Sequence, residues 1–163
     1  MRTILGIDQS YTSSGYCLIA DTGAVLAFGQ LKSDKTLDTY TRALNVALSI
    51  CQLIELHTPS QVNIEGLAFG IRGDATRDLA GLLFTIINVI KLQHPSINVE
   101  IFAPTSIKKL ATGSGKADKS AMINALPDDF RKSVLDKGFK KTTGLADIAD
   151  SYWIANMALK QSV

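Results

Sequence analysis

Short apolar runs bounded by polar turn residues occur three times near the N-terminus and twice more later in the chain. Runs of this length, rich in β-branched and aromatic residues, are typical of β-strands. An Asp-Thr-Gly sequence after the second run predicts a tight hairpin turn. We predict five strands, over Arg2–Asp8, Gly15–Asp21, Ala24–Leu31, Ser60–Gly66 and Ile97–Phe102.

Between and after these strands, apolar residues recur at every third or fourth position, which is the helical period. The order βββαβαβ followed by helices predicts an α/β fold, with a mixed five-stranded sheet flanked by helices. No internal repeat or long linker divides the chain, so we expect residues 1–163 to form one domain. The helices are predicted over residues 36–58, 73–94, 104–110, 121–126, 127–138 and 145–160.

The segment Leu79–Ile90 is apolar nearly all round. One face of such a helix packs on the sheet, and another face needs a second partner. That partner is either the first long helix or a second copy of the segment across a two-fold axis. The pattern favours a homodimer and leaves the first arrangement open.

Composition argues against a disordered protein and against a membrane-spanning one. A hydrophobic content of 46% excludes a disordered chain. The longest apolar stretch, Leu79–Ile90, is shorter than the about 20 residues that a transmembrane helix needs, and no signal-peptide pattern is visible. Cys17 and Cys51 lie in apolar surroundings without metal-ligand spacing, as expected of reduced thiols. We therefore expect a cytoplasmic protein without a membrane segment.

Charge is unevenly distributed, although the net charge is only +2. Residues 104–143 contain nine Lys or Arg against four Asp or Glu, a local balance of +5 that leaves −3 for the remainder. A basic segment on an acidic body suits a polyanion-binding surface, and it equally suits a solvated helical face.

Four acids stand at special points of the predicted elements. Asp8 ends the first strand and Glu65 ends the fourth, each after an apolar run. Asp147 and Asp150 are three residues apart, so they share one face of the final helix. Turn formation or the helix dipole explains each acid alone. If the first and fourth strands are neighbours and the final helix packs on that sheet, the four acids come close and would repel one another unless a cation neutralised them.

The four acids form an all-oxygen ligand set without Cys or His, which points to Mg²⁺ or Mn²⁺ rather than Zn²⁺. Two such ions about 4 Å apart hydrolyse phosphodiesters, because one activates the attacking water and the other stabilises the leaving 3′ oxygen. We therefore predict a site for two Mg²⁺ ions, with Mn²⁺ able to substitute.

Four sequence blocks carry a family resemblance: "GIDQSYTSSGYCLI", "VNIEGLAFG", "GSGKADKS" and "ADIADSYWIA". In order and spacing they resemble those of RuvC-type Holliday junction resolvases, endonucleases of the RNase H-like superfamily. The similarity runs over nearly the whole chain. The "GID" motif alone is shared with sugar kinases and actin-like ATPases, whereas the ordered acids with the Gly-Lys loop are more specific. The resemblance implies a Mg²⁺-dependent endodeoxyribonuclease that resolves four-way junctions and related branched DNA by paired symmetric nicks, acting as a homodimer.

The resemblance also implies roles for residues. Asp8 would bridge both ions. Glu65 would complete the site of one ion, and Asp147 together with Asp150 would complete the site of the other. Phe69 falls where such resolvases place an aromatic residue at the opened junction centre, and a core position is the rival reading. Lys116 and Lys119 would contact or orient backbone phosphates. Further DNA-binding candidates in the basic segment are Lys108, Lys109, Lys140 and Lys141.

The chain departs from the family pattern in two places. Gln9-Ser10 replace the usual Pro-Gly after the first acid, and the bulky Tyr152 and Trp153 follow the last acid, where we expect them to fill the core or border the dimer. Two alternatives remain. The "GSGKADKS" loop argues against an RNase H-like RNA-processing nuclease, and the full set of acids argues against a non-catalytic branched-DNA-binding module. Cleavage sequence preference, a branch-migration partner, and host or phage origin stay open.

Overall fold

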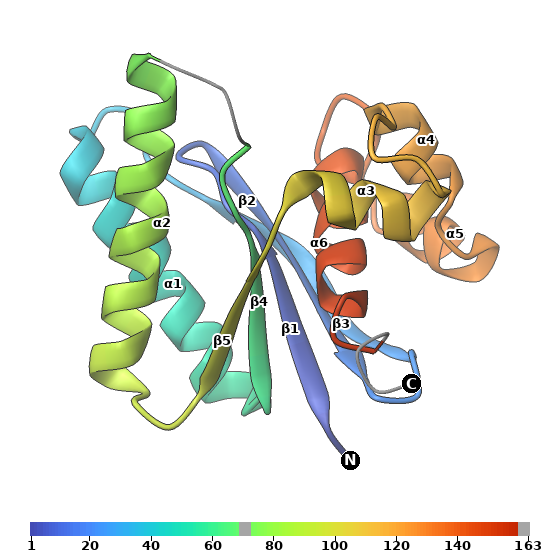
Figure 1. The fold of residues 1–163 in the computed structure, drawn as a ribbon, viewed down its shortest axis with the longest axis horizontal. Helices are drawn as coiled ribbons and strands as arrows, with labels where there is room; N and C mark the ends of the chain where they lie inside the picture. The colour runs from blue at the N-terminus through green and yellow to red at the C-terminus, as the bar shows by residue number, and fades with distance from the viewer. Residues whose placement is uncertain (69–72, 160–163) are drawn as a thin grey trace.

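The computed structural model describes residues 1–68 and 73–159, and its elements follow the predicted order (Figure 1). The strands are β1 (Thr3–Asp8), β2 (Ser13–Ala20), β3 (Val25–Lys32), β4 (Gln61–Glu65) and β5 (Asn98–Phe102). The helices are α1 (Thr39–His57), α2 (Asp74–Gln93), α3 (Pro104–Thr112), α4 (Lys119–Asn124), α5 (Asp128–Asp136) and α6 (Leu145–Asn156).

The five strands form one mixed sheet in the order β3-β2-β1-β4-β5. β1 pairs antiparallel with β2 and parallel with β4, so the predicted mixed sheet is confirmed. Because Ile7 pairs with Ile64, Asp8 and Glu65 lie beside each other one residue further along. The parallel pairing therefore brings both strand-end acids to the same edge of the sheet.

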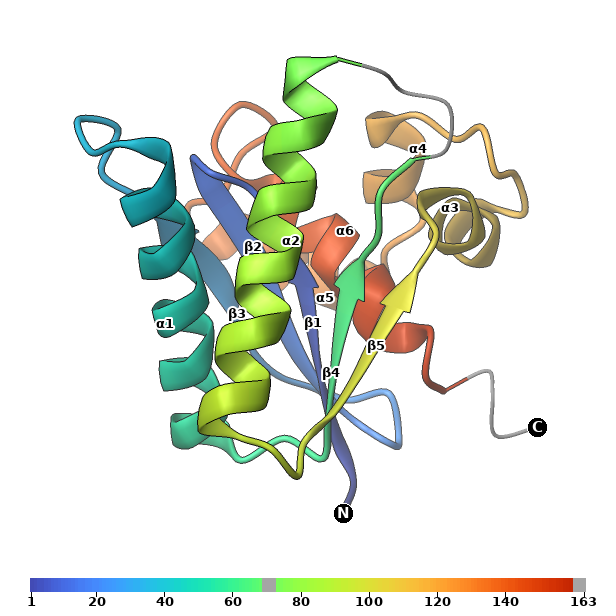
Figure 2. The same ribbon diagram turned by 60° about the vertical axis from the view of Figure 1, so that its left-hand side comes forward.

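Helices cover both faces of the sheet. α1 and α2 lie on one face, while α6 lies on the other with α3, α4 and α5 beside it (Figures 1 and 2). Two apolar clusters fill these layers, one between the sheet and the α1–α2 pair and one between the sheet, α5 and α6. The three-layer arrangement leaves the carboxyl ends of β1 and β4 between the two helical layers.

Local capping fixes several helix ends. Asp38 accepts a hydrogen bond from the Thr41 backbone N–H at 2.9 Å, and α1 ends just before Pro59. α4 begins two residues earlier than predicted, because Asp118 caps it by accepting from the Ala121 N–H at 2.8 Å. That cap places Lys119 in the first turn of α4.

Two glycines let α6 lie directly on the sheet. A Cβ at Gly6 would overlap the backbone of Ser151, and a Cβ at Gly15 would overlap the backbone of Asp147. At the other end of the helix, the Asn63 side-chain amide donates to the Ile154 carbonyl at 2.9 Å. Close packing at both ends fixes the height and position of α6 over β1, β2 and β4.

The bulky residues after the last acid belong to the core. Tyr152 is buried, and its ring centroid lies 5.0 Å from that of Phe130. The Trp153 indole donates to the Met122 carbonyl at 3.1 Å, which ties α6 to α4. The core alternative for this pair is confirmed.

α2 packs against α1, which is the first of the two arrangements left open for its apolar surface. Leu82, Ile86 and Ile90 are fully buried in that layer, whereas Phe84 stays 62% exposed. Across the described residues, none of the helices has the length and apolar character needed to cross a membrane.

Candidate active site

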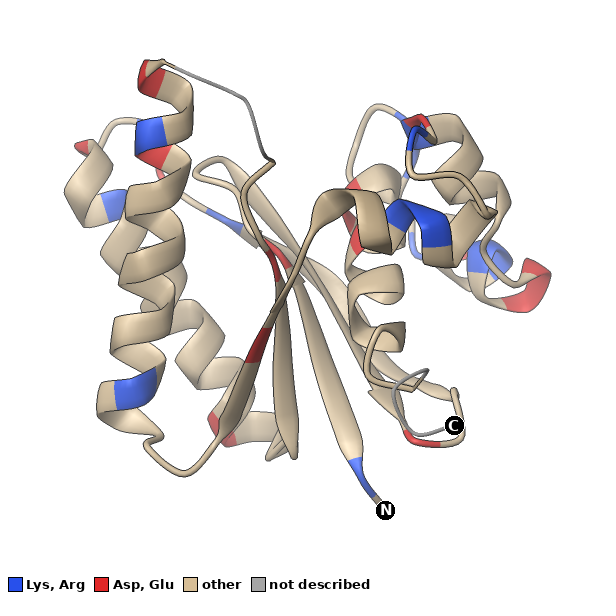
Figure 3. Cartoon of the chain, in the orientation of Figure 1, with Lys and Arg blue, Asp and Glu red and all other residues tan. Residues whose placement is uncertain are grey.

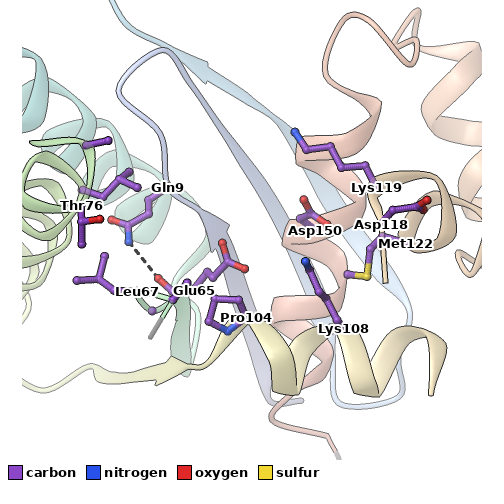
Figure 4. A pocket seen from close by; sticks show the side chains of 14 residues that line it. Gln9, Glu65, Leu67, Thr76, Pro104, Lys108, Asp118, Lys119, Met122 and Asp150 are labelled. Carbon is purple, nitrogen blue, oxygen red and sulfur yellow. Dashed lines mark hydrogen bonds between the residues drawn. The ribbon is translucent and has the colours of Figure 1, made fainter. Parts of the chain in front are cut away.

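The strand-end acids and the α6 acids meet beside one cleft. The cleft has a volume of about 440 Å³, with Gln9 and Glu65 on one wall and Asp150, Lys108 and Lys119 on the other (Figure 4). Asp8 lies next to Glu65 in the sheet and shares the face of β1 on which Gly6 contacts α6. The helix thus completes a site that the two strands begin.

Burial, followed by repulsion from neighbouring acids, raises the pKa values of three of the acids. Burial raises the pKa of Asp8 well above its usual value, and the charges of Asp150, Glu65 and Asp147 raise it further. Burial and then Asp150 raise the pKa of Glu65 to about 7. Burial also raises the pKa of Asp150 to about 6, against the opposing effect of Lys119. Asp8 is affected by the other three acids, Glu65 by Asp150, and Asp150 by Asp147, as expected of groups gathered in one site.

Two of the six candidate lysines face these acids. Lys119 lowers the pKa of Asp8 and Asp150, and Lys108 lowers that of Glu65 and Asp150. Both line the cleft from α3 and α4. In Figure 3, blue segments of these helices lie beside the red segments of α6. The two lysines offset the effects of burial and repulsion only in part, because the three pKa values remain raised.

The other lysines lie outside the cleft. Lys109, one residue from Lys108, faces away and borders a separate hollow with Met157. Exposed positions in the loops before α4 and α6 are occupied by Lys116, Lys140 and Lys141. Phe69 lies outside the described residues, so its predicted role stays a prediction.

The donor chemistry of the site fits divalent cations that prefer oxygen. The four acids supply carboxylate oxygens only, as Mg²⁺ and Mn²⁺ require. Within the described part of the chain, no three Asp, Glu, His or Cys side chains already form a closed metal-binding group. The backbone nevertheless gathers all four acids beside the cleft, where the charges of Glu65, Asp147 and Asp150 act on Asp8.

The turn that replaces the usual Pro-Gly is held by side-chain hydrogen bonds. The Gln9 amide donates to the Glu65 carbonyl at 3.0 Å, and the Ser10 hydroxyl accepts from the Thr12 N–H at 3.1 Å. The Tyr11 hydroxyl donates to the Asp78 carbonyl at 2.8 Å. These contacts join the ends of β1 and β4 and the start of α2, so the turn forms an ordered wall of the cleft.

Sequence reasoning missed two groups of residues at the site. Gly6 and Gly15 interrupt strands, which is itself a signal of close backbone approach. Gln30 donates to the Asp147 carboxylate at 2.7 Å, across 117 positions of sequence. A lone Gln in a strand carries no such signal, because the contact depends on strand register.

The mixed sheet, with acids at the ends of β1 and β4 and on a helix packed over them, places the protein in the class with an RNase H-like fold. The family model described as "Crossover junction endodeoxyribonuclease RuvC" matches residues 4–151, and the chain belongs to the RuvC family.

Relatives in this family cover most of the chain. Crossover junction endodeoxyribonuclease RuvC of Caldicellulosiruptor saccharolyticus is 26% identical over 93% of this chain and 89% of its own length. The protein of the same name from Parvibaculum lavamentivorans is 31% identical over 72% of this chain and 68% of its own length. The solved structure of Thermus thermophilus RuvC with a Holliday junction substrate superposes with a TM-score of 0.72 at 19% identity, covering 95% of this chain and 91% of that one.

Proposed function

We propose that this protein is a structure-selective endodeoxyribonuclease that resolves four-way junctions and related branched DNA. One observation carries the proposal: strand-end and helix acids meet at one cleft, with Lys108 and Lys119 on its wall. Membership of the RuvC family and the likeness to a junction-bound RuvC structure support it. We further propose that residues 1–163 form one domain that works in the cytoplasm.

Asp8, Glu65, Asp147 and Asp150 would hold two Mg²⁺ ions, for which Mn²⁺ would substitute. When bound, the ions supply an activated water and stabilise the charge that develops on the leaving 3′ oxygen. Asp8 lies beside Glu65 and feels the charges of Asp147 and Asp150, which supports its role as the ligand shared by both ions. The raised pKa values mean that cation binding must displace protons near neutral pH.

Basic residues would hold the DNA backbone. Lys108 and Lys119 face the acids, so they would orient the scissile phosphate. Exposed lysines elsewhere in the basic segment would bind flanking phosphates in a salt-dependent manner. These are Lys109, Lys116, Lys140 and Lys141. Phe69 would stack on a base at the opened junction centre.

Paired symmetric nicks require two related sites, which a two-fold homodimer provides. α1 covers one side of α2, and the exposed Phe84 on α2 offers an apolar contact for a second copy. Light scattering on the purified protein tests this point. A monomer at the concentrations that support cleavage would contradict the dimer.

The test of the activity is a cleavage assay on a synthetic four-way junction and a linear duplex of the same sequence, with Mg²⁺ or with EDTA. We expect paired nicks in the junction, none in the duplex, and none in EDTA. Equal cutting of the duplex, or cutting in EDTA, would refute the proposal. A matched RNA junction separates a DNA resolvase from an RNA-processing nuclease. Binding without any cutting would instead identify a non-catalytic module.

A further inference from the structure

A single row of residues runs across the sheet beneath α6. Asp8 pairs with Gly15, and Gly15 pairs with Gln30 on the neighbouring strand β3. Directly opposite residues in neighbouring strands share a face of the sheet. Gln30 therefore lies on the same face as Asp8, two strands away from it.

Gly15 leaves room for Asp147 in the middle of this row. A Cβ at Gly15 would overlap the Asp147 carbonyl, so the backbone of α6 rests where a side chain would otherwise stand. Asp147 is thereby placed between Asp8 on one side and Gln30 on the other.

Gln30 holds the Asp147 carboxylate directly. Its amide Nε2 donates to Asp147 Oδ2 at 2.7 Å, which leaves Oδ1 as the oxygen not engaged by Gln30. Gly144, with φ +97°, lies against the Gln30 amide, where any Cβ would overlap it. The amide is therefore confined between the start of α6 and the carboxylate.

The chemistry of the contact suits a positioning role. A neutral amide donor fixes the orientation of a carboxylate without adding a charge to the acidic site. Partners of this kind orient metal ligands in many proteins, and their loss typically weakens metal binding by about 10- to 100-fold. A lysine in place of Gln30 would instead compete with a cation for the same carboxylate.

We propose that Gln30 is a positioning residue that orients the Asp147 carboxylate for cation binding. This inference rests on the proposed function, because it takes Asp147 to be a metal ligand.

The test is a double-mutant cycle in Mn²⁺ affinity, measured by titration calorimetry on the full chain. Gln30→Met keeps the side-chain length and removes the donor, and we expect about 10-fold weaker Mn²⁺ binding from it. In the Asp147→Asn background the same change should have almost no further effect, because Gln30 acts through Asp147. Gln52→Met, on the exposed side of α1, is the matched control and should bind Mn²⁺ like the wild type.

The outcomes separate the inference from the function on which it rests. If Gln30→Met binds Mn²⁺ as tightly as the wild type, or if its loss adds in full to that of Asp147→Asn, the positioning role is wrong and the metal site stands. If the wild type binds no Mn²⁺, the proposed metal site fails and the inference fails with it. Near-UV circular dichroism confirms folding of each variant, and Gln30→Ala replaces Gln30→Met if the longer side chain disturbs packing.

Discussion

Replacing Glu65 with Gln should stabilise the protein in EDTA while weakening its cation binding. Glu65 lies at the end of β4, where burial and the charge of Asp150 oppose its ionisation and raise its pKa from 4.5 to about 7. Below pH 4.5 the group is protonated in the folded and unfolded states alike, so it costs nothing. Above about pH 7 it is ionised in both states, and the folded state bears the full penalty.

The size of the effect follows from the pKa difference. Each pKa unit corresponds to about 1.36 kcal/mol, so a rise from 4.5 to about 7 gives an upper limit of about 3 kcal/mol. Glu65 is partly exposed, and solvent screening reduces this to about 2 kcal/mol. The wild type should therefore lose stability as the pH rises from about 4.5 to about 7, and Glu65→Gln should remove most of that loss.

Urea unfolding in EDTA at pH 5 and pH 8 measures the effect. The buried side of α6 carries Trp153, the one Trp in the sequence, so its fluorescence reports unfolding. We expect Glu65→Gln to be more stable than the wild type at pH 8 and nearly equal to it at pH 5. Millimolar Mg²⁺ should stabilise the wild type more than the variant, since a ligand stabilises only the state that binds it.

Glu55→Gln makes the same chemical change at an exposed position of α1 and should leave stability nearly unchanged at both pH values. If Glu65→Gln is no more stable than the wild type at pH 8, burial and the charge of Asp150 do not oppose the ionisation of Glu65 as described.

Three further predictions address the acids, the packing of α6 and the basic wall. Asp8→Asn should lower junction cleavage by about 100-fold or more, while junction affinity in gel-shift assays stays nearly unchanged. Near-normal cutting would show that Asp8 is not a catalytic residue. Gly15→Ala should destabilise the fold by about 1–3 kcal/mol, because the added Cβ overlaps the Asp147 backbone. The same change should weaken Mn²⁺ binding. Wild-type stability in urea would contradict the close packing. Lys119→Ala should weaken junction binding and reduce the slope of log affinity against log salt by about 1; an unchanged slope would mean that Lys119 contacts no phosphate.

The sequence predicts much of this fold because its signals are local. Apolar runs that end at Asp8 and Glu65 predict strands, and the parallel pairing of their strands then brings both acids to one edge. The spacing of Asp147 and Asp150 predicts one helix face. The strands, their terminal acids and the acidic helix face can be predicted from periodicity and strand ends alone, because none of them depends on how the elements pack.

Contacts that depend on register or helix phase could not be predicted. Nothing local distinguishes Lys108, which faces the acids, from Lys109, which borders another hollow. The hydrogen bond from Gln30 to Asp147 requires the pairing of β3 with β2 and the docking of α6 together. The partner of α2 was equally undetermined, because an apolar helix face fits α1 and a second copy alike.

The docking of α6 on Gly6 and Gly15 has a consequence for the order of events during synthesis. β1 and β4 leave the ribosome well before residues 145–156, so a nascent chain can pair its central strands while both α6 acids are still missing. The acidic cleft is complete only when α6 settles on the two glycines. The four-acid site that we propose is therefore assembled only when the last helix of the fold has been synthesised and packed.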